Sequence, residues 1–179
     1  MDAICLRPAR PDDGPEVLAL WLALLEDQAG RDPRFAPADD AAARWRNDYP
    51  EWLRDPAWYL VVAEASGTLV GFATAQRWVP PPVYRASNEV YLNELYVRPD
   101  WRGRGLGRRL VEAVQDWAGT LGAVRVRVGV LAAHADGRAF WEHLGARPLT
   151  VTMTLERPRP AEAAPPPPGG VIGFRQGTR

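Results

Sequence analysis

The sequence predicts an α/β (α+β) protein in which a mixed β-sheet is flanked by helices. Strand-like and helix-like segments follow one another in the order strand, helix, helix, three strands, helix, strand, helix, strand. The 179 residues are 46% hydrophobic and 25% charged, as in a soluble globular domain. A glycine-rich turn at residues 102–107 joins a strand to a helix, an arrangement that exposes backbone N–H groups to an anion.

The N-terminal part begins with a strand over residues 4–7 and a helix. Asp12 or Asp13 can cap this helix because aspartate is a preferred N-cap residue. Its apolar residues fall on one face, as expected for a helix that packs on a sheet. They are Val17, Leu20, Trp21, Leu24 and Leu25.

A second helix is predicted to begin after Asp39 or Asp40. Pro50 lies within it, so we expect a break or kink near Tyr49. Its apolar face carries Ala42, Trp45, Tyr49 and Trp52.

A hairpin and a further strand form the middle of the chain. Residues 58–63 and 69–78 have strand character and are joined by the turn dipeptide Ser66-Gly67. A proline-rich loop follows, and then a strand over residues 90–97.

After the glycine turn we expect helix, strand, helix and strand. The first helix ends at Gly122, and the strand spans residues 124–131. The second helix covers residues 135–144 and stops at Gly145, before a last strand at 149–155. The apolar positions of the first helix are Leu106, Leu110, Val114, Trp117 and Leu121.

The composition divides the chain into a domain and a tail. Residues 1–157 are expected to form the domain, and residues 158–179 a proline-rich C-terminal tail with four consecutive prolines. Val171–Phe174 is either a short strand that docks on this molecule or a partner, or part of a floppy tail.

The charge balance and the lone cysteine exclude several classes. With 22 basic and 22 acidic residues we expect no nucleic-acid partner. We see no signal peptide and no apolar run long enough for a membrane span, so a cytoplasmic location without membrane contact is expected. Cys5 is the single cysteine, which excludes an intrachain disulfide, and we expect a buried thiol. No metal site is predicted.

The glycine turn predicts a site for a phosphate-bearing ligand. The first N–H groups of a helix lack internal partners, and glycines allow close approach. The turn lacks the Gly-Lys-Ser/Thr of a Walker A loop, and Gly103-x-Gly105-x-Gly107 differs from the dinucleotide fingerprint Gly-x-Gly-x-x-Gly. The alternative is a tight solvated turn without a ligand.

The run from Leu95 to Gly107 resembles the signature of the GNAT superfamily of N-acetyltransferases. In that family, a strand ending in Leu-x-Val precedes Arg/Gln-x-x-Gly-x-Gly/Ala, and here Arg102, Gly105 and Gly107 occupy the motif positions. The segments at residues 6–13, 67–71 and 140–146 also resemble the family, so that the likeness covers roughly residues 4–155.

The resemblance implies a centrally splayed sheet and acetyl-CoA as co-substrate. The strand residues Leu95, Tyr96 and Val97 would bond the pantetheine arm, which fills the wedge beside the next strand. A backbone N–H near Leu95 or Tyr96 would polarise the thioester carbonyl. The CoA pyrophosphate would be cradled by the N–H groups of the turn, namely Arg102, Gly103, Arg104, Gly105, Leu106 and Gly107.

Glu94 is the candidate catalytic base, because an alkylammonium with a pKa near ~10 must lose a proton before it attacks. Strict alternation places Glu94 on one face with Leu92 and Tyr96, although a bulge would re-aim these residues. The alternative is that Glu94 pairs with an arginine such as Arg77. Glu89 is a second choice, further from the acetyl position.

Two positions bear on the rest of the reaction. Trp141 stands where many family members carry a tyrosine acid, which leaves the proton donor unassigned. His134 matches a family asparagine; it either contacts the CoA arm or only starts a helix. The available lining of the acceptor site is Trp21, Glu26, Asp27, Phe35, Trp45, Trp78 and Tyr84.

The predicted function is acetyl-CoA-dependent transfer of an acetyl group to a primary amine of a small molecule or protein, in a ternary complex. The alternative is an acyl-CoA-binding or sensing module of the same fold without catalysis. Because family members are often dimers, the resemblance also implies a homodimer.

Overall fold

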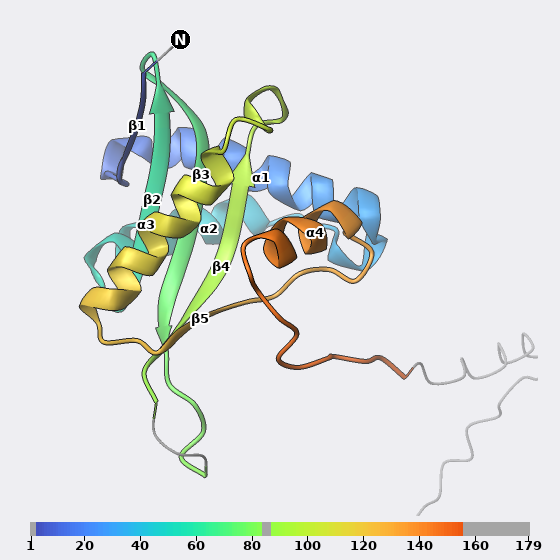
Figure 1. Cartoon of the computed structure of the whole chain (residues 1–179). Coiled ribbons are helices and arrows are strands. Elements are labelled where there is room, and N and C mark those ends of the chain that lie inside the picture. The colour runs from blue at the N-terminus through green and yellow to red at the C-terminus, as the bar shows by residue number, and fades with distance from the viewer. Residues whose placement is uncertain (1–2, 84–86, 156–179) are drawn as a thin grey trace, which may run out of the picture. The chain divides into compact units, whose positions relative to one another are not determined.

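The computed structural model describes residues 3–83 and 87–155 (Figure 1). Contacts divide the chain into the units Met1–Arg147 and Pro148–Arg179. All the described helices and strands lie in the first unit. The proline-rich tail and the segment Val171–Phe174 lie outside the described residues.

A five-stranded mixed sheet forms the centre of the first unit, with its strands in chain order β1-β2-β3-β4-β5. The first four strands pair antiparallel with their neighbours, while β5 runs parallel to β4 because α3 connects the two. The strands are β1 (Ile4–Pro8), β2 (Trp58–Ala65), β3 (Thr68–Trp78), β4 (Glu89–Val97) and β5 (Arg125–Val128).

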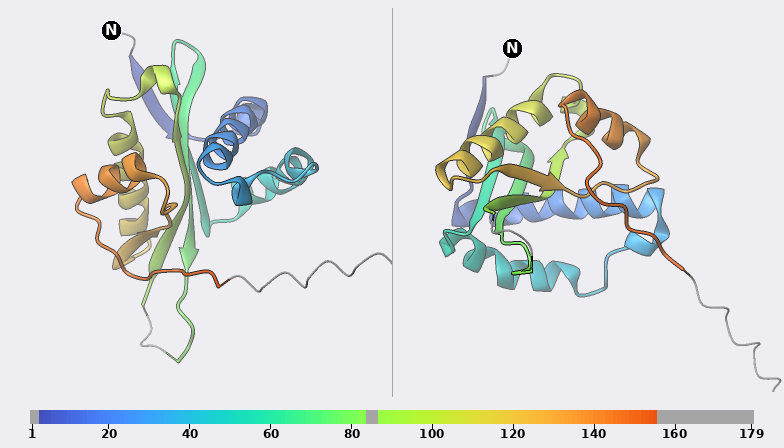
Figure 2. Two further views of the ribbon diagram at one scale, coloured as in Figure 1. Left: turned by 90° about the vertical axis from the view of Figure 1, so that its right-hand side faces the viewer. Right: turned by 60° about the horizontal axis from the view of Figure 1, so that its bottom comes forward.

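Helices cover both faces of this sheet, which confirms the predicted fold class (Figure 2). One face carries α1 (Gly14–Arg31) and α2 (Ala41–Arg54), and the other carries α3 (Leu106–Thr120) and α4 (Ala135–His143). Phe72 and Tyr96 contribute to the core under the first pair of helices, and Leu92 and Leu110 to the core under α3. None of the described helices is long and apolar enough to cross a membrane.

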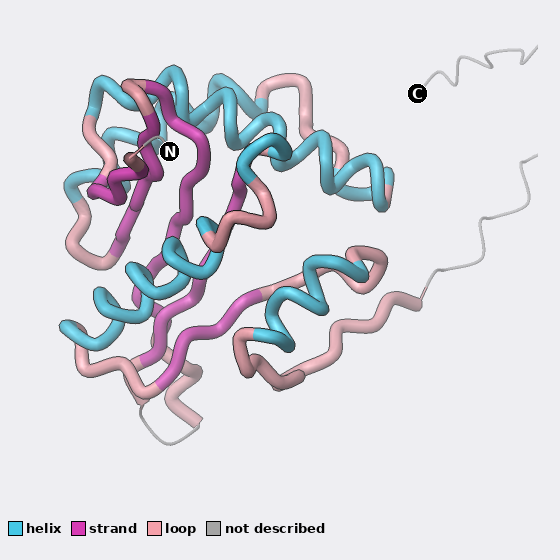
Figure 3. Tube along the Cα trace, turned by 45° about the horizontal axis from the view of Figure 1, so that its top comes forward, coloured by secondary structure: helices cyan, strands magenta, loops and turns pink. Residues whose placement is uncertain are grey.

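The parallel strands β4 and β5 separate after four paired residues. Their register runs from Glu89 opposite Arg125 to Leu92 opposite Val128, and no further pair follows (Figure 3). Residues 94–97 of β4 remain paired with β3, and residues 93–97 have no strand partner on the other side among the described residues. The splay expected from the family resemblance is therefore present, and β5 is shorter than the predicted strand 124–131.

A β-bulge in β4 changes the direction of its side chains. Thr74 lies opposite Glu94 while Ala75 lies opposite Leu92, so Asn93 is an extra residue in the ladder. The expectation that Glu94 shares a face with both Leu92 and Tyr96 is wrong for Leu92. Leu92 packs in the core under α3, whereas Glu94 and Tyr96 point toward α1, because the bulge reverses the alternation.

The described structure also lacks a break in α2 at Pro50, a side-chain cap by Asp13 on α1, and a buried Cys5. The helix α2 continues through Pro50 without a break; Tyr49 beside it is buried and donates a hydrogen bond to the Arg10 carbonyl, which anchors this turn. Asp13 does not cap α1 with its side chain, because its carboxylate accepts hydrogen bonds from the Arg7 guanidinium and the Arg10 N–H. The thiol of Cys5 is exposed, since its strand neighbours turn inward instead.

No strand forms at residues 149–155, although their sequence alternates in the manner of one. A strand requires a hydrogen-bonded neighbour, and no strand pairs with this segment among the described residues. Its apolar side chains are accordingly exposed, up to 98% for Leu155.

We expect Gly71→Ala to destabilise the fold, because a Cβ at this position of β3 would lie 2.8 Å from the Tyr96 carbonyl oxygen on β4. Backbone cannot move aside as a flexible side chain can, so the free energy of unfolding should fall by about 1–3 kcal/mol in a urea titration. Gly119→Ala is the matched control, since nothing lies within 4 Å of its Cβ and the helix α3 gains propensity there. Equal stability of the two variants would contradict the close contact between β3 and β4.

Candidate active site

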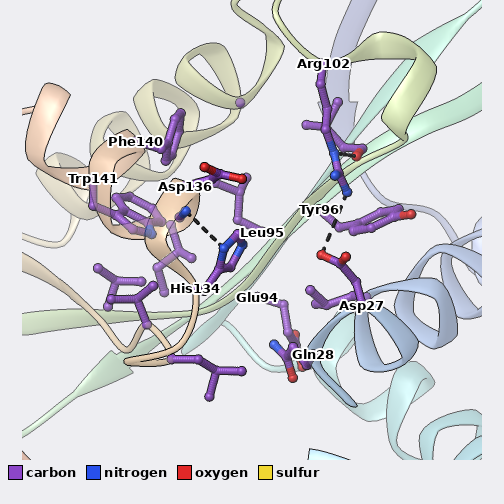
Figure 4. Close-up of a pocket in the computed structure, with 18 of the residues that line it drawn as sticks. Asp27, Gln28, Glu94, Leu95, Tyr96, Arg102, His134, Asp136, Phe140 and Trp141 are labelled. Carbon is purple, nitrogen blue, oxygen red and sulfur yellow. Dashed lines mark hydrogen bonds and ion pairs between the residues drawn. The ribbon is translucent and has the colours of Figure 1, made fainter. Parts of the chain in front are cut away.

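A cleft of about 980 Å³ opens where β4 and β5 separate (Figure 4). One wall is β4 from Leu92 to Val97, and the opposite wall is the segment Val128–Leu131 that follows β5. The C-terminal half of α1, the glycine turn and α4 close the remaining sides. The unpaired side of residues 93–97 can therefore offer backbone hydrogen bonds to a ligand.

The glycine turn forms one end of the cleft. Gly103 and Gly105 have φ of +73° and +76°, a conformation that residues with a Cβ rarely adopt. Gly105 is the N-cap of α3, and no side chain caps the free N–H groups of the first helical turn. Without acidic side chains in that first turn, the positive end of the helix dipole favours an anion.

The two arginines of the turn lie differently. Arg102 lines the cleft; its Nε donates to the Val97 carbonyl at 2.9 Å, and its Nη2 lies 4.0 Å from Oδ2 of Asp27 on α1 (Figure 4). Arg104 is not among the lining residues, and its guanidinium lies 4.9 Å from the ring centre of Trp101. Only Arg102 thus offers its charge to the cleft from this turn.

Glu94 lies in the cleft wall and accepts two hydrogen bonds. Trp21 on α1 donates from Nε1 to Oε1 at 3.1 Å, and the hydroxyl of Thr74 on β3 donates to Oε2. Burial raises the pKa of Glu94 above its ordinary value, and the two donors partly oppose this rise by stabilising the carboxylate. The alternative pairing with Arg77 is not observed, because Arg77 bonds to Asn88. A carboxyl group with a raised pKa is a stronger proton acceptor when ionised than an ordinary carboxylate.

Glu89, the second choice for the base, is committed to other contacts. Its carboxylate is buried, lies 3.3 Å from Arg125 and 3.6 Å from Arg127, and accepts a hydrogen bond from Ser87. It does not line the cleft.

His134 caps α4 and also lines the cleft. Its Nδ1 accepts a hydrogen bond from the Gly137 N–H at 3.1 Å, so this nitrogen carries no proton. A Cβ at Gly137 would lie 2.7 Å from the imidazole, which explains the glycine. Burial, reinforced by the charge of Arg31, lowers the pKa of His134. His134 therefore starts α4, as one alternative predicted, and it also lines the cleft.

The helix α4 contributes two aromatic residues to the cleft wall. Phe140 and Trp141 pack edge to face with ring centres 5.1 Å apart, and both line the cleft. A Cβ on Gly107 would lie 3.3 Å from Phe140, so α4 packs closely on the start of α3. The indole of Trp141 has no proton that an acid catalyst could supply.

The family is decided by comparison with known proteins. A model of the Acetyltransferase (GNAT) family matches residues 21–146, more than half of the chain. The chain belongs to this family.

Known GNAT proteins resemble the chain over parts of their length. A thialysine N-epsilon-acetyltransferase from Sus scrofa is 34% identical over 61 residues, which are 34% of this chain and 36% of that protein. A mycothiol acetyltransferase from Beutenbergia cavernae is 34% identical over 100 residues, which are 56% of this chain and 31% of that protein. The matches therefore span about a third of these curated relatives.

The fold has solved counterparts. The structure of aminoglycoside N-acetyltransferase AAC(6')-Iy in complex with CoA superposes with a TM-score of 0.69 at 20% identity, covering 88% of this chain and 96% of that one. At this identity the likeness establishes the fold of the GNAT domain.

The cleft of this GNAT domain brings together all but one of the predicted site residues. Their roles in catalysis and CoA binding remain predictions. The exception is Arg104, and the residues that do line the cleft are Glu94, Leu95, Tyr96, Val97, Arg102, Gly103, Gly105, Leu106, Gly107 and His134.

The predicted acceptor lining is only partly assembled. Asp27 and Phe35 line the cleft, while Glu26 is exposed and Trp45 is core. Trp78 lies beneath Arg127, and Tyr84 is outside the described residues. Sequence reasoning missed Gln28 and Arg31, which follow Leu24 at helical spacing on the lining face of α1.

We expect His134 to titrate below its ordinary pKa of about 6.5, because its environment disfavours the imidazolium. The folded protein then binds fewer protons than the unfolded chain, so this group's contribution to stability is present above about pH 6.5 and declines as the pH falls. An NMR titration of the imidazole, assigned with His134→Gln, measures the midpoint. A midpoint at or above 6.5 would contradict the half-buried, hydrogen-bonded cap.

Proposed function

We propose that the protein is an acetyl-CoA-dependent N-acetyltransferase that acetylates a primary amine of a small molecule or protein. The observation that carries the proposal is that one cleft holds an anion-suited helix start and, on its β4 wall, a carboxyl group with a raised pKa. The proposal retains the expectations of a cytoplasmic location, a homodimer, and no nucleic-acid or membrane partner.

The donor would bind along the splay. Its pyrophosphate would accept hydrogen bonds from the N–H groups at residues 102–107, with added charge from Arg102. The pantetheine arm would pair with the open side of residues 95–97, as an added strand does. That CoA occupies the solved relative AAC(6')-Iy supports this placement.

The reaction would proceed by direct attack. Glu94 takes a proton from the ammonium, directly or through water, and the freed amine nitrogen forms a bond to the thioester carbonyl carbon. A backbone N–H near Leu95 or Tyr96 stabilises the charge on the carbonyl oxygen. The C–S bond then breaks, the CoA thiolate leaves, and the nitrogen loses its second proton to water. The thiolate is a good leaving group, so water can protonate it without an acid at Trp141.

A second candidate is an acyl-CoA-binding or sensing module without catalysis. The observation that favours it is Trp141, which lines the cleft and supplies no acid. Both candidates predict CoA binding, but only the enzyme predicts acetyl transfer whose rate depends on Glu94.

Acetyl transfer tests the enzyme directly. With acetyl-CoA and a panel of polyamines, lysine, aminosugars, aminoglycosides and peptides, we expect thiol release with at least one amine. Glu94→Gln should lower kcat by roughly 10²–10⁴-fold, as for loss of a general base, while the Kd for CoA stays unchanged. Measurement of free thiol and calorimetric CoA binding give the two quantities. Binding of CoA without release for any amine would favour the sensing module.

Charge reversal tests the donor site. Arg102→Glu combined with Arg104→Glu should abolish the thermal stabilisation that CoA gives. The one attractive charge that this turn offers to the cleft becomes repulsive, and the Arg104 change adds a second negative charge nearby, over Trp101. Arg44→Glu on α2 is the control, since Arg44 is exposed and pairs only with Asp40 in the described structure. Full stabilisation of the double variant by CoA would refute binding at this turn.

A further inference from the structure

We propose that Trp21 and Thr74 are positioning residues that fix the Glu94 carboxylate for proton abstraction, with one donor on each oxygen. This inference rests on the proposed function and assigns two residues that the signature motif does not contain. Neither residue would touch the reacting atoms; each would act through Glu94.

The geometry gives each carboxylate oxygen its own donor. The Trp21 indole reaches Oε1 from α1, and the Thr74 hydroxyl reaches Oε2 from the neighbouring strand β3. Thr74 is the residue directly opposite Glu94 in the β3–β4 register, at the edge of the bulge. Two bonds from two different elements remove the freedom of the side chain to rotate away from the cleft.

Both donors are themselves held in place. Thr74 is 2% exposed, and β-branching restricts its rotamers. The ring of Trp21 packs against Trp45 with centres 6.3 Å apart, and Trp45 stacks on Tyr49 at 4.6 Å. Trp45 and Tyr49 are buried, so the indole is supported by the core between α1 and α2.

Among the described residues, no charged side chain holds the Glu94 carboxylate in place. The titratable groups that share the cleft with Glu94 come from four places. They are Asp27 and Arg31 from α1, Tyr96 from β4, Arg102 and Arg108 from the turn and α3, and His134, Asp136 and His143 from α4 and its N-cap. None of them forms a hydrogen bond or ion pair with Glu94 in the described structure. From β3, Arg77 is bonded to Asn88. Two neutral donors therefore stabilise the carboxylate against its burial.

Removal of either donor should shift the titration of Glu94 upward. A donated hydrogen bond favours the ionised form, so Trp21→Phe and Thr74→Val should each raise the pKa of Glu94, by about one unit. The acidic limb of kcat/KM should move to higher pH by the same amount, with the KM for acetyl-CoA unchanged. Thr74→Ser retains the hydroxyl and should restore the wild-type profile.

The experiment combines two readouts on the full chain. NMR of ¹³C-labelled glutamate carboxyls, with Glu94 assigned by Glu94→Gln, gives the pKa in the free protein. The pH profile of acetyl transfer to an amine accepted in the panel gives the kinetic value. Trp52→Phe is the control: it belongs to the same aromatic cluster, stacks on Trp58 at 5.2 Å, and makes no hydrogen bond to Glu94, so both values should stay at those of the wild type.

The outcomes separate this inference from the proposed function. Folded Trp21→Phe and Thr74→Val variants with an unchanged or lowered Glu94 pKa overturn the positioning role, even if Glu94→Gln abolishes transfer. Absence of transfer with every amine overturns the enzyme and with it the catalytic meaning of the positioning. Should one variant fail to fold, as judged by thermal unfolding, the other decides the matter.

Discussion

The loss of pairing between β4 and β5 after Leu92 and Val128 is the constraint on which the site depends. A strand inside a sheet normally satisfies its backbone groups on both sides. Here β4 stays bonded to β3 through Val97 but is open toward β5 from Asn93 onward, which leaves backbone donors and acceptors facing a cleft. The sheet thus provides both a rigid wall and an unfilled hydrogen-bonding edge.

The bulge at Asn93 complements this opening. It turns Glu94 toward α1 while Leu95 and Val97 pack on the opposite core, so a carboxylate enters the cleft without disturbing the hydrophobic layer under α3. One irregular residue in a strand thereby places both an unpaired stretch of backbone and a titratable side chain in the wall of the cleft.

The helix α1 links the two ends of the cleft. Trp21 in its middle bonds to Glu94, and Asp27 two turns later lies near Arg102 of the glycine turn. Asp27 is also paired with Arg31 at 2.6 Å, so its charge is shared between two arginines. The same helix therefore supports Glu94 and faces the anion-suited turn, and its Trp21 ring packs against Trp45 of α2.

The sequence by itself determined the fold class, the glycine turn and the strand that carries Glu94, because these depend on local periodicity and on backbone conformations that favour glycine. All but one of the site residues that it predicted line the cleft. Only the tertiary structure decided how Glu94 is held, since Trp21 and Thr74 are 73 and 20 residues away in sequence and no local pattern joins them to it. The same holds for the failures: Pro50 is accommodated by packing around Tyr49, and residues 149–155 have strand alternation without a neighbouring strand. Periodicity indicates which face of a segment is apolar, whereas pairing, bulges and side-chain contacts depend on what the rest of the chain brings beside it.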